Sequence, residues 1–274
     1  MYRITTPDFN LDHTLSCGQV FRWQKNGNLW TGVVNGAVIR AKQEREELII
    51  DSILDRNFIR EYFRLDDDMV KIYESINRDA LMDALIRKYR GLRLVRQDPW
   101  ECLVSYICSS NNTIRNIKNS ISRMCECFGK EIGSGYYSFP EPEMLAVIET
   151  CQMQQCRLGF RSSRVLEIAS RVAEGEFDLY RLGKLSYEEA RLELVKIHGV
   201  GNKIADCVLL FAFGKLESFP VDTHIEKIME LHYGRHITGT KSKRKEAIAG
   251  FARRYFGGYC GYAQEYLYFE DLGT

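Results

Sequence analysis

The amino-acid sequence predicts an α+β protein in which an N-terminal antiparallel β-sheet subdomain is followed by two mostly α-helical subdomains. From residue 18 to about residue 51, apolar and polar residues alternate between turn sequences, as in a meander of half-buried strands. From about residue 53 onward, apolar residues recur at the three- and four-residue spacings of helices. No second strand–helix–strand pattern follows, which excludes a doubly wound parallel sheet.

The predicted sheet is organised by two turns. Asn26–Gly27–Asn28 separates its first two strands, and Asn35–Gly36, the strongest short hairpin signal, separates the next two. The expected strands cover residues 20–24, 29–34, 37–40 and 47–50.

The predicted helices are delimited by residues that cap or break them. Pro99 suits the first turn of a helix, residues 109–112 end it, and Gly129 ends the next one. A loop with two glycines and a proline is expected over 133–140. The expected helices cover residues 55–63, 69–76, 79–87, 99–107, 114–128, 144–148, 162–174, 187–198, 204–211, 223–231, 245–255 and 259–267.

We divide the chain into residues 1–95, an N-terminal sheet subdomain with flanking helices, and residues 96–274, a helical body in two lobes. Two helices joined by a short hairpin, at about residues 187–213, lie within that body. The formal net charge of the 274 residues is only +1. Basic clusters in such a chain are typical of a solvated surface, and composition alone does not indicate nucleic acid.

Membrane and metal classes are not supported by the composition. No apolar run is long enough to span a bilayer, and the N-terminus lacks the apolar core of a signal peptide. The nine cysteines are scattered and contain no pair of Cys-x-x-Cys units, which argues against zinc. Free thiols fit a cytoplasmic, intracellular protein.

The most informative stretch is 194–207, in which the turn His-Gly-Val-Gly joins two helical patterns. Ser186 and Glu189 form a capping box for the first helix. Gly199 and Gly201 permit positive φ and bare the backbone N–H groups at the start of the second helix, which favours phosphate binding. The alternative is an ordinary αα-hairpin with a glycine turn.

This stretch resembles the helix–hairpin–helix motif of DNA repair glycosylases. Lys203 lies in the second helix, and Asp222 follows 222 − 203 = 19 residues later, enough for a helix and a loop to bring its carboxylate back to the amine. In that superfamily a lysine and an aspartate at these places form the active site, in a cleft between the lobes. The resemblance implies that neutral Lys203 attacks C1′ of the sugar and forms a Schiff base, while Asp222 stabilises positive charge at the sugar.

Each of these residues also has a structural interpretation. Taken alone, Lys203 would be an exposed helix lysine, and Asp222 would cap the helix expected over 223–231, a role that does not exclude catalysis. Cys207 lies on the same helix face as Lys203, where a thiolate could pair with the ammonium or a thiol could pack in the core. His224 would bind a substrate phosphate or lie on a helix surface.

Four further blocks, together with the hairpin region, resemble the 8-oxoguanine DNA glycosylase/lyase family. The blocks are 11–23, 107–112, 158–161 and 261–264, and they follow the family's order over nearly the whole chain. The resemblance implies a bifunctional enzyme of base excision repair. Such an enzyme flips 8-oxoguanine out of duplex DNA, excises it through a lysine Schiff base and nicks the abasic strand by β-elimination.

The resemblance also implies how the base is recognised. The carbonyl of Gly18 accepts the N7 proton that distinguishes 8-oxoguanine from guanine, and Gln264 hydrogen-bonds the Watson–Crick edge. Tyr268 stacks on the base, and Cys207 belongs to the same pocket. Taken alone, Gly18 would be a turn glycine, Gln264 a surface glutamine and Tyr268 a core aromatic.

Other matched positions concern the DNA around the flipped base. Asn111, followed by Asn112, matches the residue that fills the vacated space. Phe160 matches an aromatic wedge in the opposite strand, and Arg161 an arginine that contacts the opposite cytosine. The eukaryotic branch has a second arginine that contacts this cytosine, and this chain has Asn116 at that position. A missing bidentate contact is worth about 1–3 kcal/mol of discrimination, so we expect a weaker preference for cytosine opposite the lesion.

The expected partner is double-stranded DNA containing 8-oxoguanine, bound by a monomer that contacts no membrane and is nucleoid-associated if the source is a prokaryote. No organic cofactor is implied. The hairpin carbonyls could hold a metal cation that bridges to a phosphate, as in relatives. Cys260 is alone near the C-terminus, so the four-cysteine iron–sulfur cluster of some relatives is not expected.

Two rival interpretations stay open on the sequence. The first is a superfamily glycosylase for another base, such as an alkylated purine, against which Gly18, Gln264 and Tyr268 argue together. The second is a non-catalytic DNA-binding module, against which the pair of Lys203 and Asp222 argues.

Overall fold

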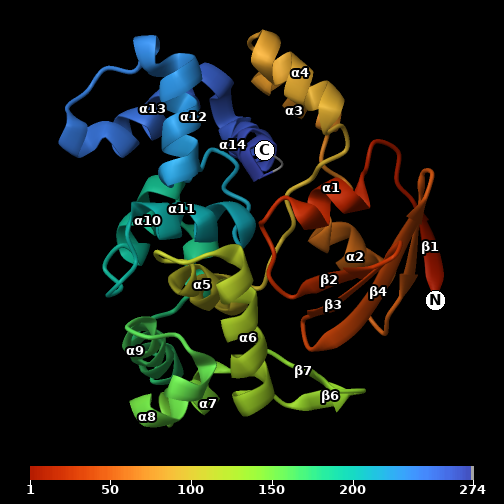
Figure 1. Cartoon of the computed structure of the whole chain (residues 1–274), viewed down its shortest axis with the longest axis vertical. Coiled ribbons are helices and arrows are strands. Elements are labelled where there is room, and N and C mark those ends of the chain that lie inside the picture. The colour runs from red at the N-terminus through yellow and green to blue at the C-terminus, as the bar shows by residue number, and fades with distance from the viewer. Residues whose placement is uncertain (273–274) are drawn as a thin grey trace.

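The computed structural model describes residues 1–272, and it confirms the α+β organisation with an N-terminal antiparallel sheet and a helical body (Figure 1). All neighbouring strands of the sheet run antiparallel, in the order β1-β5-β4-β3-β2. The strands are β1 (Tyr2–Thr5), β2 (Trp23–Asn26), β3 (Leu29–Val34), β4 (Ala37–Glu44) and β5 (Glu47–Asp51).

Both predicted turns form two-residue hairpins, which fix the register of the sheet. Gly27 and Asn28 connect β2 to β3, and Asn35 and Gly36 connect β3 to β4. Asn35 and Gly36 both have positive φ, as the favoured Asn-Gly hairpin turn requires. The sheet and the helices α1 (Leu11–Ser16) and α2 (Arg56–Tyr62) share a hydrophobic core that is separate from the larger core of the helical body.

The structure differs from the sequence prediction around the first strands. Strand β1 and helix α1 are not predicted, and β2 begins at Trp23 instead of at residue 20. The cause lies in Gln19, whose side-chain amide donates to the carbonyls of Thr14 and Arg93, both at 2.8 Å. These bonds hold the segment after α1 as a loop, so it does not join the ladder of the sheet.

The helical body has two lobes, and α5 belongs to one of them and lies where the two meet (Figure 1). One contains α5 (Pro99–Cys108), α6 (Ile114–Phe128), α7 (Pro142–Ala146), α8 (Thr150–Met153) and α9 (Arg161–Ala173), together with a small hairpin of β6 (Glu131–Gly133) and β7 (Tyr136–Tyr137). The other contains α10 (Tyr187–Leu194), α11 (Asn202–Phe211), α12 (Thr223–Tyr233), α13 (Arg244–Phe256) and α14 (Cys260–Leu272). The β6–β7 hairpin and α8 are not predicted, and α10 ends four residues before the predicted helix end at residue 198.

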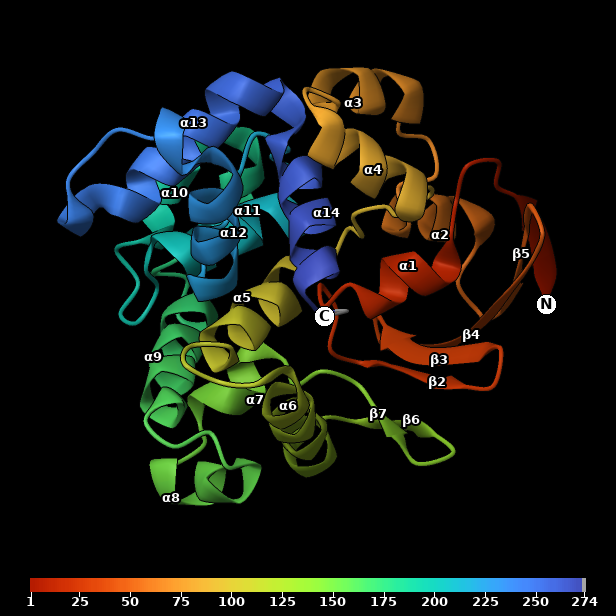
Figure 2. The same cartoon turned by 45° about the horizontal axis from the view of Figure 1, so that its top comes forward.

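Two helices of the N-terminal part pack against the C-terminal helix. The helices α3 (Met69–Ile76) and α4 (Ala80–Lys88) lie beside α14, and their buried apolar residues belong to the helical core (Figure 2). The division of the chain at residue 95 therefore stays a prediction, because the region before it contributes to both cores.

Helix α11 lies at the centre of the helical body, packed on α5 and α10. Every residue from Ile204 to Phe211 is buried. Lys203 stands in the first turn of this helix and is therefore carried by a rigid element.

Candidate active site

An open cavity of about 780 Å³ is lined by residues of both helical lobes and of the loop that follows α1. Its volume lies in the range of small-molecule pockets. Its walls come from the loop after α1, the α5–α6 loop, α11, the segment before α12, and α14. The predicted site residues that line it are Gly18, Asn111, Asn112, Gly199, Gly201, Lys203, Cys207, Asp222, His224, Gln264 and Tyr268. Phe160 and Arg161 lie outside it.

Lys203 is half-buried in this cavity and is not an exposed helix lysine. Its Nζ donates to the hydroxyl of Ser109 at 3.3 Å and lies 5.1 Å from the ring centre of Tyr106. Ser109 and Tyr106 both come from α5 and its C-terminal cap, so the amine is anchored across the cavity from its own helix. The sequence did not indicate either contact.

Asp222 caps α12, as its structural interpretation predicts. Its Oδ1 accepts hydrogen bonds from the backbone N–H groups of His224 and Ile225 at 2.9 and 2.8 Å. Both bonds fall on Oδ1, so the cap does not use Oδ2. Within the described residues, no ion pair shorter than 4.0 Å joins Asp222 to Lys203. The cap thus fixes the carboxylate at the cavity while leaving one oxygen for chemistry.

The Cys207 thiol is buried in the cavity wall, and burial raises its pKa to about 12. A neutral thiol near pH 7 favours the packing interpretation over the thiolate–ammonium pair. His224 is exposed, and its Nδ1 contacts the carboxylate of Asp271 on α14. Its ring also meets Tyr268 edge to face, with ring centres 6.1 Å apart.

The three base-recognition residues of the sequence analysis gather on one side of the cavity. Gly18 has a φ of +94°, and a Cβ there would lie 3.1 Å from the Tyr268 ring. Gln264 is only 6% exposed, so it is not a surface glutamine. Tyr268 is half-buried, and burial raises the pKa of its hydroxyl. The three side by side form a wall that can take a flat ring.

The loop between α5 and α6 is held from α9. Asn111 adopts a φ of +49°, in the left-handed region that few residues other than glycine occupy. The guanidinium of Arg161 donates to the carbonyls of Ser110, Asn111 and Leu158. Arg161 is 8% exposed, and these contacts use four of its five N–H groups. Arg161 therefore positions the Asn111 loop, a contact that the sequence did not indicate.

Of the remaining predicted DNA-contact residues, Asn112 lines the cavity, whereas Phe160 and Asn116 are exposed outside its lining. Phe160 is 54% exposed, and the guanidinium groups of Arg161 and Arg164 lie 4.4 and 4.8 Å from its ring centre. Asn112 donates from its side chain to the carbonyl of Cys108 at 3.1 Å. Asn116 is exposed in the first turn of α6, where its backbone N–H binds the capping hydroxyl of Thr113.

The hairpin between α10 and α11 presents free backbone groups. Of its two glycines, only Gly199 uses positive φ (+84°), whereas Gly201 has an ordinary φ of −93°. Gly201 is the N-cap of α11 and offers no side-chain cap, so the first N–H groups of the helix stay open to a phosphate. The predicted Ser186–Glu189 capping box at the start of α10 is present.

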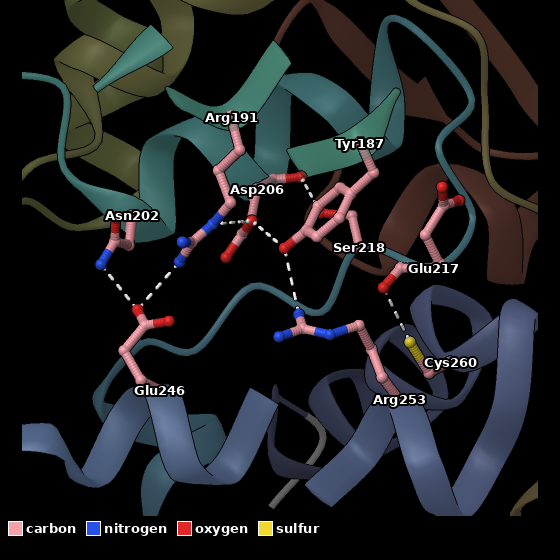
Figure 3. A network of polar contacts seen from close by, with 9 residues as sticks. All are labelled: Tyr187, Arg191, Asn202, Asp206, Glu217, Ser218, Glu246, Arg253 and Cys260. Carbon is pink, nitrogen blue, oxygen red and sulfur yellow. Dashed lines mark hydrogen bonds and ion pairs between the residues drawn. The ribbon is translucent and has the colours of Figure 1, made fainter. Parts of the chain in front are cut away.

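A polar network holds the hairpin helices from behind (Figure 3). Asp206, on α11, is 2% exposed and accepts from Arg191 of α10 at 2.9 Å and from the Tyr187 hydroxyl at 2.8 Å. Arg191 also binds Glu246 of α13 at 2.8 Å, and Glu246 accepts from Asn202 at 2.6 Å. Burial raises the pKa of Asp206, and the Arg191 guanidinium opposes that shift. The network ties α10, α11 and α13 together and so fixes the direction of the Lys203 helix.

Glu265 is a cavity residue that the sequence analysis missed. It follows Gln264 on α14, is 2% exposed and has a pKa raised to about 8, above all by burial. All nine cysteines are unpaired thiols. Among residues 1–272, no cluster of three or more His, Cys, Asp or Glu side chains is arranged to hold a metal, and no helix has the length and apolar character to cross a bilayer.

Two family models together match residues 1–253 of the chain. Residues 1–103 match the family described as 8-oxoguanine DNA glycosylase, N-terminal domain. Residues 104–253 match the HhH-GPD superfamily of base excision DNA repair proteins. The two matches meet within α5 and include the sheet and the helical body as far as α13, whereas α14 lies beyond them.

Solved structures and curated proteins agree with these matches. MBOgg1, solved in complex with a low-affinity DNA ligand, is 38% identical, with a TM-score of 0.91 over 98% of this chain and 94% of that one. The Clostridium acetobutylicum 8-oxoguanine glycosylase/lyase, solved with double-stranded DNA containing cytosine opposite 8-oxoguanine, is 33% identical, with a TM-score of 0.89 over 97% and 92%. A probable N-glycosylase/DNA lyase of Methanothermobacter thermautotrophicus is 29% identical over 97% of this chain and 94% of its own length.

Proposed function

Because the chain belongs to the 8-oxoguanine DNA glycosylase/lyase family, we propose that it excises 8-oxoguanine from duplex DNA and then nicks the abasic strand. The observation that carries this function is the cavity itself. Its lining combines Lys203 and Asp222, from α11 and the segment before α12, with Gly18, Gln264 and Tyr268, from the loop after α1 and from α14. A base that enters this cavity places its glycosidic bond at the amine.

Gly18, Gln264 and Tyr268 recognise the base. A stacked base cannot reach the cavity, so the nucleotide is flipped out of the duplex. Tyr268 stacks on its ring and the buried Gln264 amide binds its Watson–Crick edge. The Gly18 carbonyl accepts the N7 proton of 8-oxoguanine and repels the lone pair of guanine at that atom. The Cys207 thiol completes the pocket as a neutral, compact side chain.

Lys203 and Asp222 cleave the glycosidic bond. Neutral Lys203 attacks C1′, the base departs, and the adduct opens to a Schiff base that permits β-elimination of the 3′ phosphate. Asp222 stabilises the positive charge that develops at the sugar through the oxygen that its helix cap leaves unused. Ser109 holds the amine in place before the substrate arrives.

DNA is held by the surface around the cavity. The open N–H groups at the start of α11 bind a phosphate. The exposed His224, which lines the same cavity, binds a phosphate as well. Asn111, supported by Asn112, fills the space of the flipped nucleotide, and Phe160 enters the opposite strand. Arg161 holds the Asn111 loop and has one N–H group left for the opposite base.

A metal cation fits the hairpin. Among the described residues, the carbonyls of His198, Gly199 and Val200 accept no backbone hydrogen bond, and carbonyl oxygens are suitable ligands for such an ion. A cation there would bridge the hairpin to a phosphate. We further propose that the protein acts as a monomer on cellular DNA, without an organic cofactor.

The test is borohydride trapping on a duplex with 8-oxoguanine opposite cytosine. The wild-type protein should form a covalent adduct, and Lys203→Gln should form none. Lys42→Gln on the sheet removes the same charge far from the cavity and should trap like the wild type. Base release without an adduct in the wild type would mean a monofunctional glycosylase. Neither release nor adduct, on this duplex or on an abasic one, would refute the proposal.

A further inference from the structure

Glu265 is a buried acidic side chain in the active-site cavity to which the steps above give no role. It follows Gln264, which reads the base, on α14, and both residues line the cavity. Its Oε1 has no hydrogen-bond partner among the described residues. A buried carboxyl oxygen without a hydrogen-bond partner is costly, so its presence in a binding cavity calls for a ligand or a reaction that uses it.

Six ionisable groups surround Glu265, five from four other segments and one from its own helix. The thiol of Cys17, in the loop after α1, lies beside it and donates to the Thr14 carbonyl. Lys203 and Cys207 face it from α11, and Asp222 from the segment before α12. The hydroxyls of Tyr106 on α5 and Tyr268 on α14 complete the set.

These surroundings keep Glu265 protonated near neutral pH. Burial, together with the charge of Asp222, raises its pKa to about 8, while Cys17 and the Lys203 ammonium pull in the opposite direction. When Lys203 becomes neutral for attack, its opposing influence disappears. The carboxyl therefore holds its proton most firmly in the state in which the reaction begins.

The reaction needs such a proton at one particular moment. When the bond between C1′ and N9 breaks, its electron pair stays on the base, which leaves as an anion unless it is protonated. The Gly18 carbonyl has no proton, the Gln264 amide does not release one, and Asp222 acts on the sugar. A general acid at the base contributes typically about 10²- to 10⁴-fold to such a step.

We propose that Glu265 protonates the departing 8-oxoguanine. This inference rests on the proposed function and adds the general acid to it. The carboxyl gives its proton to the base as the C1′–N9 bond breaks, while the lone pair of Lys203 Nζ forms the new bond to C1′. The resulting secondary ammonium then returns one proton to the Glu265 carboxylate. The base leaves neutral, and the adduct and the acid are neutral at the end.

The test compares two substrates, because only one of them has a base to protonate. Glu265→Gln should slow single-turnover excision of 8-oxoguanine opposite cytosine by roughly a hundredfold or more. Nicking of a duplex with a preformed abasic site should stay within about twofold of the wild type, since no base departs there. Glu270→Gln, outside the cavity lining on the side of the same helix that bonds Lys88 and Tyr89, is the matched control and should leave both rates unchanged.

The pH dependence gives a second readout that needs no variant. In the wild type, excision relative to abasic-site nicking should fall as the pH rises through about 8, because Glu265 loses its proton there. Glu265→Gln should lack this alkaline decrease.

Three results would overturn the role of Glu265. The first is unchanged excision in Glu265→Gln. The second is an equal loss of excision and nicking in a Glu265→Gln protein that melts like the wild type. The third is a wild-type ratio of excision to abasic-site nicking that does not depend on pH. If Glu265→Gln does not fold, the wild-type ratio decides. Failure of the wild type to trap on an abasic duplex would instead refute the lysine chemistry itself.

Discussion

Replacing Arg191 by methionine should destabilise the protein, and more strongly at pH 8 than at pH 5. The change removes the guanidinium that binds Asp206 at 2.9 Å and Glu246 at 2.8 Å. Asp206 is 2% exposed and would keep only the Tyr187 hydroxyl among its present side-chain partners. Loss of one partner of a buried pair costs about 3–5 kcal/mol. Because the tyrosine bond remains and Arg191 is 19% exposed, we expect about 3 kcal/mol, or a fall in Tm of roughly 6–12 °C.

The pH dependence follows from the direction of the pKa shift. Burial already raises the pKa of Asp206 in the folded protein, and Arg191 opposes this. Without Arg191 the folded-state pKa rises further above the unfolded value of about 3.9. A carboxyl with a raised folded pKa binds a proton more tightly when folded, so stability is lost as the pH rises above the unfolded value. The variant should therefore lose stability, relative to the wild type, between pH 5 and pH 8.

Urea unfolding followed by circular dichroism measures this, with Asp206→Asn and the double variant completing a cycle. The double variant has no buried carboxylate to leave unpaired, so it should be less destabilised than the sum of the single changes by more than about 1 kcal/mol at pH 8. Additive effects at both pH values would refute the reasoning. Such a result would mean that Arg191 stabilises α10 and α13 through packing and its bond to Glu246 alone.

Three further predictions concern the cavity and the DNA contacts. Asp222→Asn should keep the cap of α12 and lose base excision, whereas Asp222→Ala should lose both, with about 1 kcal/mol less stability; equal melting of the two variants would contradict the cap. Asn116→Arg should increase the preference for cytosine opposite 8-oxoguanine by about 5- to 150-fold, measured as single-turnover rates on four duplexes; an unchanged ratio would count against the missing contact. Gly18→Ala should cost about 1–2 kcal/mol because of its positive φ and should displace Tyr268, so excision should fall while abasic-site nicking persists; equal losses would point to general unfolding.

The sequence could predict those parts of the fold that depend on neighbouring residues. The Asn35–Gly36 turn, the capping box of Ser186 and Glu189 and the cap at Asp222 are each made by residues within three positions of one another. The same holds for Gly199, whose positive φ belongs to the turn itself. Local chemistry determines these features, and the structure confirms them.

Contacts between distant segments could not be predicted in this way. Gln19 and Arg93 are 74 residues apart, and their bond turns an apparent strand into a loop. Arg161 lies 50 residues from Asn111, and its hydrogen bonds to that loop make it a positioning residue. In both cases the side chain alone suggests a different partner, because sequence patterns give the chemistry of a group without giving the backbone that it meets.

Glu265 lies between these two cases, because a local signal for it exists. Residues 260–267 of α14 are apolar or small on nearly all sides, and a helix of that kind is buried all round. A glutamate inside such a helix must therefore lose most of its hydration, which predicts a raised pKa and a neutral carboxyl. The block that resembles the family, 261–264, ends at Gln264 and does not include Glu265. The position of Glu265 relative to the base and to Lys203 could not be predicted without the fold. Lys203 lies 265 − 203 = 62 residues away in the sequence, and Cys17 lies 265 − 17 = 248 residues away.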